Sequence, residues 1–110
     1  MKERGHGRIV FITSSTPKEP IDGLLLSNVY RAGVTGLAKT LATEFGHAGI
    51  TVNSVCPGPY ETDRIRELLA IRAQKAGSGI DEERRRYVAG VPVGRFGEPH
   101  ELAGALLFLA

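Results

Sequence analysis

Arg-Ile-Val-Phe-Ile-Thr, residues 8–13, is the stretch that decides the fold. It is apolar without polar alternation and rich in β-branched residues, which is typical of a strand buried on both faces of a parallel sheet. A second run of this kind, Ile-Thr-Val-Asn-Ser-Val-Cys, occupies residues 50–56, and a long helical pattern lies between the two. Strand, helix and strand in this order predict a βαβ unit with a right-handed crossover.

Both predicted strands run into turns that can carry chemistry. Ser14 and Ser15 follow the first strand, and Pro57 and Gly58 follow the second. Ligands of open parallel sheets bind beyond the carboxyl ends of the strands. We therefore expect a hydroxyl group and a stiff backbone turn on the same rim, as half of an active site.

The intervening helix is expected from about Leu24 to Phe45. Its apolar residues recur at spacings of three and four, which predicts one buried stripe. The stripe consists of Val34, Leu37, Leu41 and Phe45. A loop with two prolines precedes the helix, and glycines at positions 46 and 49 are expected to end it.

The rest of the chain is predicted to contain a charged helix, a short charged turn, a loop and a final apolar helix. Thr62 or Asp63 is expected to cap the charged helix, and Gly77-Ser78-Gly79 is expected to end it. A short charged turn is predicted at residues 81–87. A final apolar helix has Pro99 in its first turn. Two parallel strands alone make an incomplete sheet, and the final apolar helix lacks a C-terminal cap. The sequence therefore predicts an α/β fragment of a larger domain.

Composition argues against several classes of function. The chain has 110 residues, 42% of them hydrophobic and 24% charged, and a formal net charge of +2. So small a charge makes no case for nucleic acid or an anionic membrane as the main partner, and no apolar stretch is long enough to span a membrane. The single cysteine, Cys56, cannot form an internal disulfide, which favours a cytoplasmic location. The three histidines lack ligand-like spacing, so no metal site is predicted.

Five segments together resemble the short-chain dehydrogenase/reductase family, and within that family they are most similar to the 3-oxoacyl carrier-protein reductase type. They span residues 7–15, 32–42, 49–58, 61–63 and 94–99, and they include Gly-Arg-Ile-Val, Asn-Ser-Val-Cys-Pro-Gly and Gly-Arg-Phe-Gly-Glu-Pro. The resemblance implies a partial Rossmann-type fold, a doubly wound parallel sheet, with residues 1–110 as a single partial domain. It places the family's glycine-rich dinucleotide turn upstream of Met1.

The resemblance also implies an activity, which is hydride transfer between NAD or NADP and a small-molecule carbonyl or alcohol substrate. Ser14 occupies the position of the family's catalytic serine, whose hydroxyl donates to the substrate oxygen. Alternatively, Ser14 only satisfies backbone groups at the strand end. The family further implies a homo-oligomer, a dimer or tetramer, with the long helix against a second subunit.

The family's Tyr-x-x-x-Lys motif is altered in this chain. Ser27 stands at the tyrosine position, thirteen residues after Ser14, and Arg31 stands at the lysine position. An aliphatic hydroxyl is a weaker acid than the phenol that serves the family as general acid or base. Arg31 can still hold the nicotinamide ribose but does not pass on a proton. Proton supply is then expected from Ser27, from water, or from Tyr30 if a one-residue register adjustment or a local π-bulge turns it inward. Otherwise Tyr30 packs against the preceding loop or a partner subunit.

The turn after the second strand resembles the family's nicotinamide-holding turn. The residues expected to contact the cofactor there are Pro57, Gly58, Tyr60 and Thr62. The alternative is a plain strand-to-helix connection with a threonine cap. Residues 62–91 are expected to form the substrate lid, whose arginines either bind a phosphate or carboxylate or line a solvated helix face.

Two rival interpretations stay open at this point. A non-catalytic reductase homologue would have kept the fold and lost the proton relay, and the residues at positions 27 and 31 support that interpretation. A truncated product without function is the other. The choice between NAD and NADP is not decided by these residues.

Overall fold

The computed structural model describes all residues from Met1 to Ala110. The chain divides into two compact units. The sheet unit comprises residues 1–58 and 103–110, and the helical unit comprises residues 59–102. None of the helices is both long enough and apolar enough to cross a membrane.

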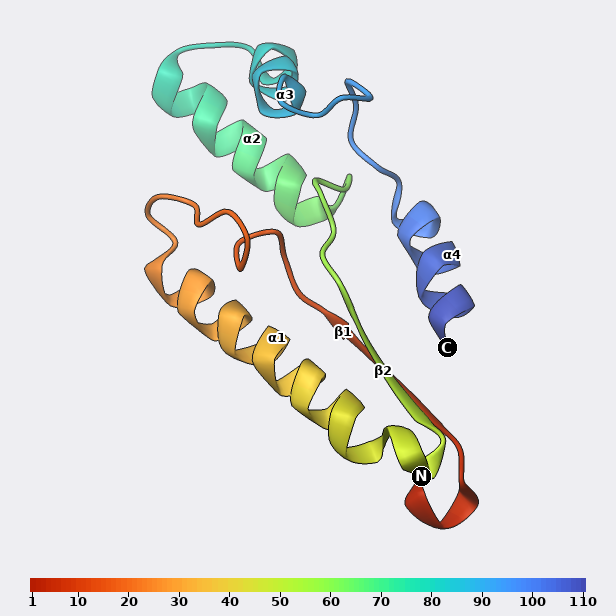
Figure 1. Cartoon of the computed structure of the whole chain (residues 1–110). Coiled ribbons are helices and arrows are strands. Elements are labelled where there is room, and N and C mark those ends of the chain that lie inside the picture. Colours follow the sequence, from red (N-terminus) through yellow and green to blue (C-terminus); the bar gives the residue numbers. More distant parts are fainter. The chain divides into compact units, whose positions relative to one another are not determined.

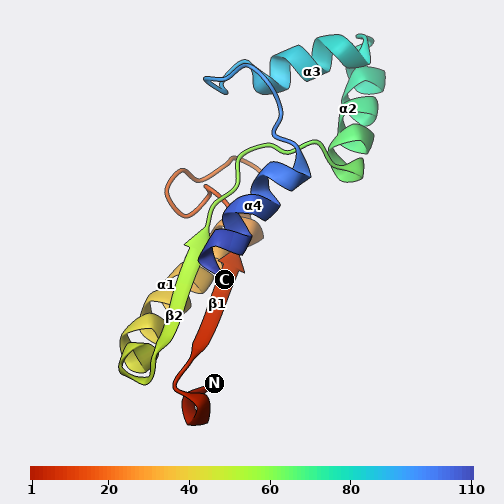
Figure 2. The ribbon, with the colours of Figure 1, turned by 90° about the vertical axis from the view of Figure 1, so that its right-hand side faces the viewer.

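The sheet unit is built on two parallel strands, β1 (Gly7–Ile12) and β2 (Ile50–Val55). The first residues of the two strands pair with each other and so do the last, so both strands end at the same level. The chain passes from β1 to β2 through α1 (Leu25–Phe45) and a 3-10 turn (Gly46–Ala48), and α1 lies along the strands (Figure 1 and Figure 2). The predicted strand–helix–strand unit is confirmed.

The buried stripe of α1 differs from the predicted one at one position. Ala38 is 5% exposed, whereas Leu37 is 48% exposed. Successive residues point about 100° apart around a helix, so Val34, Ala38 and Phe45 share one side and Leu37 lies at its edge. The apolar spacing favoured Leu37 because alanine contributes little to a hydrophobic pattern.

The backbone comes very close to itself where the chain enters the sheet. After a short 3-10 turn (Lys2–Arg4), the N–H of Gly7 donates to the carbonyl of Gly49 at 3.3 Å. Gly49 has a φ of +71°, and a Cβ built there would lie 2.1 Å from the carbonyl oxygen of Gly5. Only glycine fits this position without strain, because it accepts positive φ and has no side chain.

The helical unit contains α2 (Asp63–Ala76) and α3 (Ile80–Val88). Its core consists of Leu69, Val88 and Phe96. The ring of Tyr87 lies against Phe96, with 5.4 Å between the ring centroids. The side chain of Thr62 caps α2 by accepting the N–H of Ile65 at 3.3 Å, as the sequence predicted.

α3 corrects the prediction of a short charged turn at residues 81–87, because those residues form most of a nine-residue helix. Acidic residues fill its first turn and arginines its last, an order that the helix dipole favours. Val88 then anchors the helix in the core. Hydrophobic periodicity could not show this helix, since six of its nine residues are charged.

The last helix, α4 (Pro99–Leu109), has proline in its first turn, as predicted. Its final residues, 103–110, group with the sheet unit. Leu106 and Leu109 are half-buried there, while Leu107 and Phe108 are 76% and 89% exposed. α4 therefore presents apolar side chains on more than one side.

Candidate functional site

Hydrogen bonds between the two strands continue one residue beyond their last paired residues, Ile12 and Val55. The N–H of Thr13 donates to the carbonyl of Val55 at 2.9 Å, and the Thr13 hydroxyl lies 3.2 Å from the same oxygen and 3.3 Å from Cys56 Sγ. Thr13 precedes Ser14, and Cys56 precedes Pro57. The sheet unit therefore brings both turns to one rim at the carboxyl ends of the strands.

The side chain of Arg31 connects α1 to this rim by hydrogen bonds. Its Nη1 donates to the carbonyl oxygen of Thr13 at 2.7 Å, and its Nε donates to Ser27 Oγ at 3.1 Å. Residues four apart lie on the same side of a helix, so Ser27 and Arg31 turn together toward the strand end. The acceptor on Thr13 belongs to the peptide group that joins it to Ser14. The structure thus brings together Ser14, Ser27 and Arg31 as neighbours on one rim.

The turn after β1 positions the Ser14 hydroxyl. The N–H of Thr16 donates to Ser14 Oγ at 3.4 Å, which leaves the hydroxyl hydrogen free to be donated elsewhere. The hydroxyl of Thr16 is buried and has no hydrogen-bond partner in the chain. Sequence reasoning did not single out Thr16, because an orphaned hydroxyl has no signature in a sequence.

Tyr30 is not brought into this group. It is 70% exposed and makes no hydrogen bond to Ser14, Ser27 or Arg31. α1 is α-helical from Leu25 to Phe45, so the π-bulge that would turn Tyr30 inward is absent. Its contribution to proton supply stays a prediction without support from the geometry.

The predicted cofactor residues fall into both units. Pro57 and Gly58 end the sheet unit, while Tyr60 and Thr62 belong to the helical unit. Tyr60 forms a parallel bridge with Gly97, where a Cβ would lie 2.6 Å from the Tyr60 ring. The hydroxyl of Thr62 already accepts the helix-capping hydrogen bond. Contact of these residues with a nicotinamide stays a prediction.

Three of the six arginines of the predicted lid, Arg66, Arg84 and Arg86, form ion pairs with carboxylates. Glu61 receives Arg84 at 2.6 Å, and Arg86 contacts Glu83 at 2.8 Å. The hydrogen bond and charge of Asp63 raise the pKa of Arg66 above its ordinary value. These pairs support the solvated-face interpretation of the arginine run over an anion-binding one.

A bidentate ion pair connects the segment before α4 to the first turn of that helix. Arg95 donates to both carboxylate oxygens of Glu101, at 2.9 and 2.7 Å, and to the carbonyl of Phe96. The N–H of Glu98 also donates to Glu101, and together these bonds lower the pKa of the Glu101 carboxyl to about 2. Arg95 therefore serves as a structural hydrogen-bond donor.

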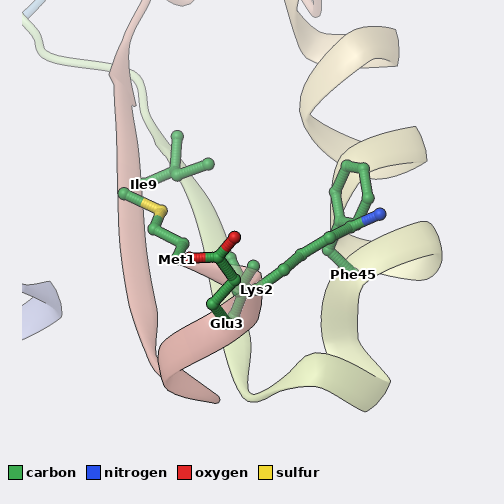
Figure 3. Close-up of a pocket in the computed structure, with 6 residues that line it drawn as sticks. Met1, Lys2, Glu3, Ile9 and Phe45 are labelled. Atoms are coloured by element: carbon green, nitrogen blue, oxygen red, sulfur yellow. The ribbon is translucent and has the colours of Figure 1, made fainter.

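A hollow in the sheet unit lies away from the rim. It is lined by Met1, Lys2, Glu3, Ile9, Phe45 and Ile50, at the amino ends of the strands. Figure 3 shows the side chain of Lys2 reaching toward Phe45, whose ring centroid is 4.4 Å from the ammonium nitrogen. The hollow is thus separate from the predicted site.

Comparison with protein families and known proteins gives a consistent result. Residues 1–110 match the family described as Enoyl-(Acyl carrier protein) reductase. The chain is 39% identical to the acetoacetyl-CoA reductase of Rhizobium meliloti and 38% identical to the 3-oxoacyl-acyl-carrier-protein reductase FabG of Escherichia coli. Both matches cover 100% of this chain but only 42% and 41% of those proteins.

Solved structures agree with the sequence matches. L-sorbose reductase from Gluconobacter frateurii, complexed with NADPH and L-sorbose, superposes with a TM-score of 0.92 and 29% identity, over 99% of this chain and 42% of that one. An NADPH-bound short-chain oxidoreductase from Pseudomonas aeruginosa, described as containing an atypical catalytic center, gives a TM-score of 0.78 and 29% identity over 98% and 40% of the two chains.

Proposed function

The chain belongs to the short-chain dehydrogenase/reductase family, and from this premise we propose that the natural protein containing it is a nicotinamide-dependent oxidoreductase. It would transfer a hydride between NAD or NADP and the carbonyl or alcohol carbon of a small molecule, and its relatives favour a 3-oxoacyl thioester as that substrate. The observation that carries the proposal is the position of Arg31, which joins Ser27 to the peptide group preceding Ser14.

The hydroxyls on the rim support carbonyl chemistry. Ser14 Oγ and Ser27 Oγ each accept a hydrogen bond from the protein, so each keeps its own hydrogen for a substrate oxygen. Hydroxyl donors aimed at an oxygen that gains negative charge lower the barrier to hydride transfer. Arg31 adds a fixed positive charge beside them. Because a guanidinium does not release its proton, the proton itself would come from Ser27 or from water.

The donors at the rim fit a nicotinamide nucleotide. The Nη2 group of Arg31 has no partner in the chain, and a planar group of N–H donors suits the hydroxyls of a ribose. Pro57 and Gly58 lie on the same rim, and Tyr60 and Thr62 follow them in the chain. When bound, the nicotinamide supplies or accepts the hydride. Arg31 would hold the ribose, while the turn would hold the carboxamide.

The long helix supports the proposal of a homo-oligomer. Leu25, Leu26 and Val29 on α1 are 75%, 69% and 61% exposed. Apolar side chains gathered on one helix are typical of a subunit contact. Sedimentation of the natural protein would test this, since a monomer at micromolar concentration would contradict it. A cytoplasmic location stays a prediction.

The activity is tested by following NADPH and NADH oxidation with acetoacetyl-CoA and with simple ketones, using the natural protein. We expect Ser14→Ala to lower kcat about 100-fold or more, because a donor to the developing oxyanion is lost. Ser15→Ala is the matched control, since Ser15 is exposed and only its backbone carbonyl is used. Tyr30→Phe should leave the rate unchanged.

One rival function has an observation in its favour. The general acid of the family is absent at Ser27, and the exposed Tyr30 does not replace it. A protein that binds NADPH but reduces no carbonyl compound with either cofactor would be a non-catalytic homologue. Equal activity of the Ser14 and Ser15 variants would also contradict the proposed mechanism.

A further inference from the structure

Glu61 lies between Tyr60 and Thr62, the two residues of the helical unit that the proposed function places against the nicotinamide. The Glu61 carboxylate connects its own turn to α2 and α3 by ion pairs. Arg84 Nη2 from α3 is 2.6 Å from Glu61 Oε1, and Arg66 Nη1 from α2 is 3.7 Å from the same atom. The Glu61 side chain is only 12% exposed, and the side chain of Arg84 is 42% exposed against 58% for that of Arg66. The pair with Arg84 is therefore the dominant contact.

Arg84 is itself held in place from a second side. Its guanidinium carbon lies 5.3 Å from the centroid of the Phe96 ring, and Phe96 belongs to the core of the helical unit. A guanidinium stacked on an aromatic face and paired with a carboxylate is fixed in orientation. Arg84 thus joins the buried core to the turn that contains Glu61.

The backbone of this turn is fixed by separate hydrogen bonds. The N–H of Glu61 donates to the carbonyl of Gly97 at 2.8 Å, and the N–H of Gly97 donates to the carbonyl of Pro59 at 3.0 Å. Removing the Arg84 side chain therefore leaves the turn attached through its backbone. What is lost is the connection from the turn to α3.

We propose that the Glu61–Arg84 ion pair couples the nicotinamide-holding turn to the substrate lid, with Arg84 as a positioning residue. This inference rests on the proposed function. A cofactor that engages the backbone at Tyr60 would restrict the remaining motion of this hydrogen-bonded turn, and the ion pair of Glu61 with Arg84 would pass that restriction on to α3. Coupling of this kind is reciprocal, so an ordered lid also strengthens cofactor binding.

The test measures NADPH affinity and amide hydrogen exchange of α3 in the natural protein. Binding of NADPH should slow exchange in α3 several-fold in the unaltered protein. Arg84→Gln should abolish that slowing and weaken NADPH binding about tenfold, because it leaves a poorly exposed carboxylate without its nearest cation. Arg84→Lys keeps the charge and should preserve part of both effects. Arg85→Gln is the control, since Arg85 lies on the same helix, is exposed and has no ion pair.

The possible outcomes separate the inference from the proposed function. If the unaltered protein binds NADPH and the Gln variants at positions 84 and 85 behave alike, the coupling is refuted and the function stands. If Arg84→Gln lowers only the melting temperature and leaves affinity and α3 exchange as before, the pair is structural and the inference is again refuted. If the unaltered protein binds neither NADPH nor NADH, the proposed function fails, and the inference with it.

Discussion

Replacing Arg31 with methionine should destabilise the sheet unit by about 3 kcal/mol. The guanidinium makes two charge-assisted hydrogen bonds, one to the Thr13 carbonyl at 2.7 Å and one to Ser27 Oγ at 3.1 Å. A hydrogen bond to a charged group contributes about 1.5–3 kcal/mol, and Arg31 is half-buried, so the lower end of that range applies to each bond. Methionine keeps the aliphatic stem, so packing of the side chain on α1 changes little.

The assay is urea unfolding of the natural protein, followed by circular dichroism. Lys39→Met is the matched control, because Lys39 lies on the same helix, is exposed and has no ion pair. Arg31→Lys should recover about half of the loss, since an ammonium group reaches one of the two acceptors but not both. If Arg31→Met and Lys39→Met have the same free energy of unfolding, the bridge from α1 to the strand end contributes nothing. The assignment of Arg31 to the rim would then be wrong.

Three further predictions concern single residues. The pKa of the Glu101 carboxyl should be about 2 rather than its usual 4.5 when the titration is followed by NMR. The ionised carboxylate stabilises the fold above a pH of about 4.5, and this contribution is lost as the pH falls toward about 2. Arg95→Gln should bring the pKa of Glu101 back toward 4.5. Thr62→Ala should lower the free energy of unfolding by about 1 kcal/mol in a urea melt through loss of the α2 cap, and Thr62→Ser should not. Gly49→Ala should cost more than about 1 kcal/mol in the same assay, because its φ is +71° and the new Cβ would clash with the Gly5 carbonyl; a neutral effect would contradict the close approach.

Much of the sheet unit was accessible from local sequence patterns. Strands β1 and β2 and helix α1 lie within one or two residues of their predicted bounds, because β-branched runs and glycine stops are local signals. The buried stripe of α1 was wrong at Leu37, since a hydrophobic pattern gives Ala38 little weight although it is the more buried residue. α3 was missed as a helix because charge order along its axis, rather than periodicity, favours it.

The site was accessible only in outline. The sequence predicts that Ser14 and Pro57 share a rim, since parallel strands end together, and the hydrogen bonds between the residues preceding them agree. It does not predict that Arg31 bonds the Thr13 carbonyl, because eighteen residues separate the two and the bond depends on how α1 lies on the strands. The ion pair of Glu61 and Arg84 could not be predicted either, because the two residues are twenty-three positions apart and their contact depends on how the helical unit packs.

The hydrogen bond between Ser27 and Arg31 constrains how these two positions can evolve. A lone change of Ser27 to tyrosine would remove the acceptor of Arg31 Nε and bring a bulky ring to a place where a small hydroxyl now sits. A lone change of Arg31 to lysine would leave either Ser27 or the Thr13 carbonyl without its donor. A change from this serine–arginine pair to a tyrosine–lysine pair would therefore pass through a less stable intermediate, so the two positions are expected to change together.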